Sequence, residues 1–176
     1  IGISSITNNA PSVFPLGETI VTWIATDNHG NFASAPQKIT VVDTTAPTIT
    51  APDDIIFEAL SPTENTISID ISSATDIIDS NPTIINNAPS AFQLGETIVT
   101  WTATDAAGNS AVATQKITVV DTISPTIVAP DGIEAEATSA TQNTVTLGQA
   151  IAADFVGIQS ITNDAPDVFP VGETIV

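Results

Sequence analysis

The sequence contains no cysteine, no methionine and no tyrosine, and it has a single histidine. Without cysteine there is no disulfide framework, no thiolate nucleophile and no cysteine-ligated metal centre. One histidine and no arginine leave few groups for acyl or phosphoryl transfer. We therefore expect that the chain is not an enzyme and that it has no catalytic residues.

Positive charge is almost absent. The 176 residues include 2 Lys+Arg against 20 Asp+Glu, a net charge of −18. Such a chain repels phosphate backbones, which excludes nucleic acid as a partner through a basic patch. No apolar run reaches the roughly 18–20 residues of a membrane span. Charged residues make up 12% and are nearly all negative, which favours an extracellular or cell-surface location, with a surface built from Thr, Ser and Asn.

The sequence is rich in internal repetition. Asn8 and Asn86 lie in matching segments 78 positions apart, and Asn163 lies in a third. A unit of this size exceeds the roughly 20–50 residues of a solenoid repeat, so each unit should own a core. The recurring segments are 6–14, 84–92 and 161–169; 17–21, 95–99 and 172–176; and 38–44 and 116–122.

Unit boundaries are expected at two Asp-Thr-x-x-Pro junctions, Asp43–Pro47 and Asp121–Pro125. They divide the chain into a partial unit at 1–43 without its opening strands, a complete unit at 44–121, and a partial unit at 122–176 without its closing strand. We interpret the chain as a window onto a longer repetitive protein.

The complete unit carries strand patterns only. Turn signals recur every 8–12 residues and no helical periodicity is present, which predicts an all-β fold of antiparallel β-sandwiches. Alternation places Val99, Trp101 and Ala103 on the inward face; Trp23, the counterpart of Trp101, is expected in a core as well. The expected strands are 48–50, 54–59, 66–71, 82–87, 90–94, 97–104 and 110–120.

The run Leu94–Ala111, closing on Ile117–Asp121, resembles the core of a hyalin repeat (HYR) domain, and the opening Pro47–Ile55 fits the same family. The resemblance implies tandem immunoglobulin-like sandwiches in an extracellular adhesive or structural protein. Many members carry a cysteine pair, with one cysteine just before the proline that Ala51 precedes here, so their usual disulfide is missing.

That missing bridge has an energetic cost. Removing a native disulfide from a small extracellular domain costs about 2–5 kcal/mol, and a domain of this size is marginally stable. Repulsion among the carboxylates adds to the deficit. End-to-end packing of units, a bound cation, or both would compensate. Calcium suits carboxylate and amide oxygens, and at a concentration one hundred times its Kd it would add about 2.7 kcal/mol.

Candidate calcium ligands follow from the immunoglobulin-like arrangement, in which a unit's exit linker meets the loops at the N-terminal pole of the next. We hypothesise an ion at each junction, held mainly by Asp43, Asp76 and Asp105, and then by Asp121 and Asp154. Further candidates are Asp79 and Asn109, together with Asp27, which is the counterpart of Asp105.

Simpler interpretations remain open for several of these residues. Asp105 and Asn109 are common hairpin-turn formers, and Asp43 and Asp121 are also typical of polar linkers. The two lysines should point outward and form exposed salt bridges of little energetic value.

The main functional hypothesis is a structural segment of a long extracellular fibre or surface layer. Its partners would be neighbouring repeats of the same chain and other copies of it. The alternative is a stalk or binding module of a cell-surface adhesin that recognises a glycan or a protein.

Overall fold

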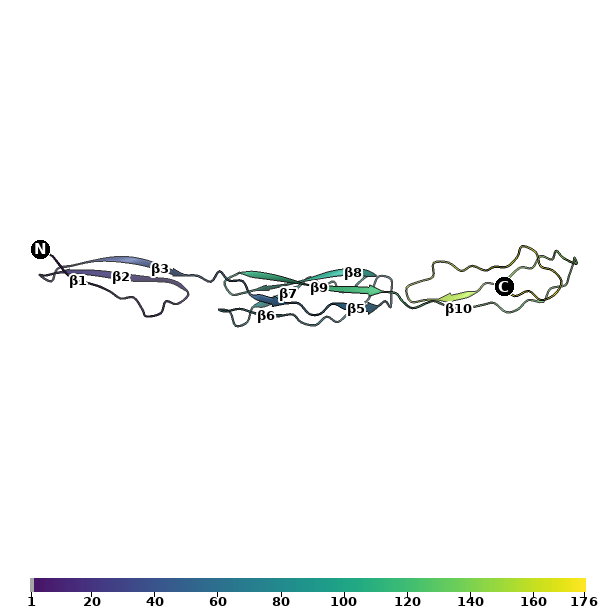
Figure 1. Ribbon diagram of the computed structural model, residues 1–176, viewed down its shortest axis with the longest axis horizontal. Helices are drawn as coiled ribbons and strands as arrows, with labels where there is room; N and C mark the ends of the chain where they lie inside the picture. Colours follow the sequence, from purple (N-terminus) through teal and green to yellow (C-terminus); the bar gives the residue numbers. More distant parts are fainter. Residues whose placement is uncertain (1) are drawn as a thin grey trace. The chain divides into compact units, whose positions relative to one another are not determined.

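A computed structural model describes residues 2–176, and all of its regular elements are strands (Figure 1). None of the described residues lies in a helix that could cross a membrane. The strands form four sheets, ordered β1-β2-β3, β4-β6, β5-β9-β8-β7 and β10-β11. The predicted all-β fold is confirmed.

The first sheet is built from β1 (Ile3–Asn8), β2 (Gly17–Asp27) and β3 (Phe32–Val41), each antiparallel to its neighbour. Trp23 lies on β2 and donates its indole N–H to Gln37 Oε1 at 2.8 Å. Its side chain is 40% exposed, so the expectation of a core position is wrong for Trp23. The reason is that no second layer covers this sheet face among residues 2–176.

The three predicted units, 1–43, 44–121 and 122–176, are called the first, central and third repeats here. The central repeat contains two sheets. Strand β4 (Thr48–Thr50) pairs antiparallel with β6 (Ser73–Thr75). The second sheet holds β5 (Ile55–Glu58), β9 (Ser110–Val120), β8 (Gly95–Thr104) and β7 (Thr83–Asn86). Strand β5 runs parallel to β9, in contrast to the antiparallel pairing expected throughout. Two sheets of this kind make the repeat a β-sandwich.

The core of the central repeat comes mainly from β8 and β9. Trp101 is 3% exposed and donates to Gln115 Oε1, itself buried, at 3.3 Å. Alternate residues of each strand point inward, as expected for a half-buried strand. The predicted inward face is therefore confirmed for Val99, Trp101, Ala103, Ile117 and Val119, which are all buried.

Two predicted strands are wrong. Residues 66–71 form no ladder although Ile67 and Ile69 are half-buried, and the short strand of this region is β6 instead. Residues 90–94 contribute only an isolated bridge from Phe92 to Asn65. Alternation indicates which side chains are half-buried, but residues 66–71 have no hydrogen-bonded neighbouring strand among residues 2–176.

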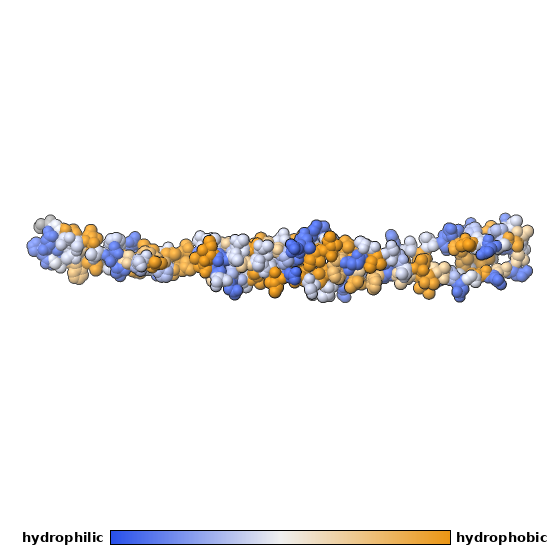
Figure 2. Space-filling model, turned by 60° about the horizontal axis from the view of Figure 1, so that its bottom comes forward, coloured by the Kyte–Doolittle hydropathy of each residue, from blue (hydrophilic) through white to orange (hydrophobic). Residues whose placement is uncertain are grey.

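The third repeat shows β10 (Thr126–Val128) paired antiparallel with β11 (Ile151–Ala153). Asn143 and Phe169 form a bridge that repeats the one between Asn65 and Phe92. Many apolar side chains are exposed on the molecule, and orange atoms are spread over the face in Figure 2.

The chain divides into two compact units. One comprises residues 2–50, 72–85 and 102–113, and the other comprises 51–71, 86–101 and 114–176. The first compact unit therefore contains the strands of the first repeat and one end of the central repeat. All candidate ligands at the first junction lie in this unit.

Candidate metal centre

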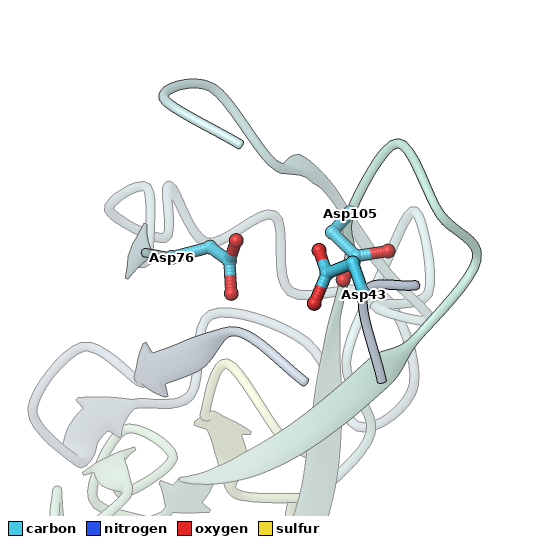
Figure 3. A group of neighbouring side chains, drawn as sticks. All are labelled: Asp43, Asp76 and Asp105. Atoms are coloured by element: carbon cyan, nitrogen blue, oxygen red, sulfur yellow. The ribbon is translucent and has the colours of Figure 1, made fainter. Parts of the chain in front are cut away.

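Three aspartates, Asp43, Asp76 and Asp105, converge at the first junction and are called the aspartate trio below. Each follows a strand: Asp43 comes two residues after β3, Asp76 directly after β6, and Asp105 directly after β8. One carboxylate oxygen from each lies within 4.8 Å of the others. Figure 3 shows their carboxylates directed toward a common space.

Asp105 is the most buried member, with 6% of its surface exposed. Burial raises the pKa of Asp105. The side-chain and backbone hydrogen bonds from Asn109, with those from Gly108 and Ala107, lower it by more, so the net pKa lies below its usual value. Asn109 donates its backbone N–H to Asp105 Oδ1 and its amide to Oδ2, both at 2.8 Å. Gly108, at φ 93°, completes the turn. Asp105 is thus a hairpin-turn residue and also a member of the trio.

Asp76 carries an oxygen that lacks a partner. Its Oδ1 accepts hydrogen bonds from the backbone N–H groups of Asp79 and Ile78 at 2.8 Å each, and these bonds lower its pKa. Its Oδ2 is buried and has no hydrogen-bond partner among residues 2–176. A buried polar atom is rarely left unpaired, and a bound ion or water is one physical explanation of such a case.

Asp43 is held in place by the turn that follows it and by the hairpin. Its Oδ1 accepts the backbone N–H of Thr45 at 3.1 Å, and its carbonyl oxygen accepts the Asn109 amide at 3.3 Å. The amide nitrogen of Asn109 therefore connects Asp43 to Asp105, since it donates to the Asp43 carbonyl oxygen and to Asp105 Oδ2.

The separations within the trio allow a calcium ion. Calcium–oxygen bonds of 2.3–2.6 Å place two ligands of one ion at most about 5 Å apart. The separations of up to 4.8 Å fall within the calcium limit.

Neither lysine of the chain competes for these carboxylates, because Lys38 pairs with Glu18 and Lys116 with Glu96. The predicted outward lysine salt bridges are confirmed.

The other predicted ligands lie outside the trio. Asp79 accepts the N–H groups of Asn81 and Ala106 at 2.9 Å, one on each oxygen. Asp27 forms the same turn with Asn31 that Asp105 forms with Asn109. Among the described residues, neither aspartate belongs to a group of three convergent acidic side chains.

The second junction repeats part of the pattern. Asp154 accepts the N–H groups of Val156 and Gly157 at 2.7 and 3.0 Å, as Asp76 does with its own following residues. Asp121 is exposed. In the part of the chain that the structure describes, these two form no convergent group of three. Glu58, which sequence reasoning did not single out, bonds to Thr122 beside this junction.

Comparisons with known proteins connect these features to a family. The HYR domain model matches residues 42–119. The chain is 36% identical to "Hyalin" of Lytechinus variegatus over 93% of its own length and 33% of that protein. It is 32% identical to "Hyalin" of Strongylocentrotus purpuratus over 98% of its length and 15% of that protein. The chain therefore spans no more than a third of these relatives.

A structural comparison gives a weaker likeness. The extracellular domain of Protocadherin GammaB4 matches with a TM-score of 0.34 and 18% identity, over 86% of this chain and 30% of that one. The assignment therefore depends on the sequence matches and on the β-sandwich of the central repeat. Residues 42–119 belong to the HYR domain family.

Proposed function

We propose that this chain is a stretch of a structural, adhesive protein located outside the cell or at its surface, in which HYR-type sandwiches are stacked end to end. Repeat units would end at the junctions after Asp43 and Asp121. Hyalin relatives along almost the whole chain support this proposal. So do the three tandem copies of the motif.

The second part of the proposal is a calcium ion at the first junction, bound by the aspartate trio. The observation that carries it is the convergence of three carboxylates within 4.8 Å, one of them with a buried, unpartnered oxygen. Three neighbouring negative charges repel one another unless a cation lies between them. An ion there would join the linker residue Asp43 to two loops of the following repeat.

Calcium removal tests this site. Thermal unfolding of the chain with excess calcium and with EGTA should differ, with a lower Tm in EGTA, because a ligand that binds only the folded state stabilises it. Asp76→Asn should abolish most of the difference. Asp27→Asn is the matched control, since Asp27 has the same kind of turn but lies outside the trio. An identical Tm with calcium and with EGTA would refute the site.

A filament requires a separate test. Electron micrographs of the native material should show thin fibres with an axial repeat of one or two domains. Isolated globular particles would favour the alternative of a binding module.

A further inference from the structure

Two hydrogen bonds between Thr122 and Glu58 hold the chain where it leaves the central repeat. Glu58 is the last residue of β5, and it pairs in parallel with Val120, the last residue of β9. Ala59 N–H donates to the Val120 carbonyl at 2.7 Å, which completes the ladder. Thr122 follows two residues later, with its backbone N–H donating to Glu58 Oε1 and its hydroxyl to Oε2, both at 2.8 Å.

These contacts continue the sheet beyond its last ladder bond. The Glu58 side chain takes the place of a backbone acceptor, so the N–H of Thr122 is satisfied although no strand continues there. Both bonds go to a carboxylate, and charge-assisted bonds are roughly twice as strong as neutral ones. Engaging the N–H and the hydroxyl of one residue fixes its backbone and its side-chain rotamer together.

The next residues restrict the linker further. Pro125 lies three positions after Thr122, and a proline confines the residue before it, Ser124, to extended conformations. The short exit segment 121–125 is therefore held at both of its ends. A segment restricted in this way has little freedom to act as a hinge.

The same residues recur at the repeat spacing. Glu58-Ala59 returns 78 positions later as Glu136-Ala137, and Thr122 has its counterpart 78 positions earlier in Thr44. Each half of the contact thus recurs at one other place, the glutamate in the third repeat and the threonine directly after the first. Hairpin residues such as His29 and Ala107 differ between repeats, so this recurrence is not general to all positions.

We propose that Glu58 and Thr122 form an exit latch, which fixes the backbone of the linker as it leaves its own repeat, and that each repeat of this protein encodes such a latch. The latch goes beyond the proposed calcium site because it requires no ion. It would set the direction in which each linker presents its aspartate, Asp121 in the central repeat, to the following repeat.

Hydrogen exchange of the Thr122 amide, measured by NMR on the whole chain in EGTA, tests the latch. In the wild type this amide should exchange about 10- to 100-fold more slowly than an unstructured one, as expected for a bond to a charged group. Glu58→Ala should remove that protection and leave the core amides of Trp101 and Val119 protected. Thr122→Ser, which keeps both donors, is the matched control and should remain protected.

Further variants keep the test decisive if Glu58→Ala loses its fold. Glu58→Gln retains the shape and one acceptor oxygen, and it should give intermediate protection. Thr122→Val retains the N–H bond but not the hydroxyl bond, and its amide should exchange faster than in the wild type. Rapid exchange at Thr122 in the wild type, or equal exchange in Glu58→Ala, would overturn the proposal. Because EGTA is present throughout, failure of the latch and failure of the calcium site give different results.

Discussion

The side chain of Asn65 is expected to be a main support of the central repeat, although it lies in no strand. It is 1% exposed and makes four hydrogen bonds. It accepts from the backbone N–H groups of Leu60 at 2.8 Å and Ser61 at 3.2 Å. It donates to the carbonyl oxygens of Ser61 at 2.9 Å and Phe92 at 3.0 Å.

Replacing Asn65 by alanine should be destabilising. A buried group left without its partner costs about 1–3 kcal/mol. The Phe92 carbonyl keeps the backbone N–H of Asn65 as a partner, so one such group is counted, at the Leu60–Ser61 turn, and the expected loss is about 1–3 kcal/mol. For a domain of this size each kcal/mol lowers the Tm by about 4–8 °C, so the Tm should fall by about 4–24 °C.

The assay is thermal unfolding followed by tryptophan fluorescence in a Trp23→Phe background, so that Trp101 alone reports on the central repeat. Asn87→Ala is the matched control. Asn87 is exposed and accepts one backbone hydrogen bond from Thr100, at 2.7 Å. Since water can replace that bond, its loss should cost about 1 kcal/mol or less. Equal effects of the two substitutions would show that the buried Asn65 side chain is not a main support of the repeat.

Two further predictions concern the two tryptophans and the turn at Asp27. Trp101→Ala should lower the free energy of unfolding by about 3–5 kcal/mol. Trp23→Ala should lower it by less than half as much, because Trp101 is 3% and Trp23 40% exposed. Equal losses of unfolding free energy in chemical denaturation would contradict this difference in burial. Hydrogen bonds from the Asn31 side chain and from the His29 and Asn31 backbone lower the pKa of Asp27. The stabilisation that this carboxylate gives is complete above its unfolded pKa, about 3.9, and is lost as the pH falls through the lower folded value. The Asn31 amide resonance should therefore keep its native position at pH 4, and a midpoint at or above pH 4 in an NMR titration would show that the turn bonds are absent.

The fold was predictable in the two long strands of the central repeat. Strands β8 and β9 and their inward residues follow from the pattern of Val99, Trp101 and Ala103, since one face of each strand is buried. The same pattern misled at 66–71, because an apolar alternation does not reveal whether a neighbouring strand supplies ladder bonds. Trp23 was misplaced for a related reason, since its burial depends on a second layer rather than on its own strand.

The candidate site was predictable in part. The linker position of Asp43 and the loop positions of Asp76 and Asp105 suffice to bring them to one end of a sandwich. Sequence could not show that Asn109 would brace Asp43 through its amide nitrogen, since that contact depends on side-chain orientation. Glu58 was missed, although the recurrence of Glu-Ala at positions 136–137 was a usable signal.

A crystal structure of the chain grown with calcium, with anomalous diffraction data, would locate a bound ion. We expect one calcium peak between Asp43, Asp76 and Asp105, with an oxygen from each at about 2.3–2.6 Å. The peak should lie next to Asp76 Oδ2, the buried oxygen that has no partner in the described part of the chain. Three carboxylates turned away from one another, with no peak between them, would contradict the proposed calcium site.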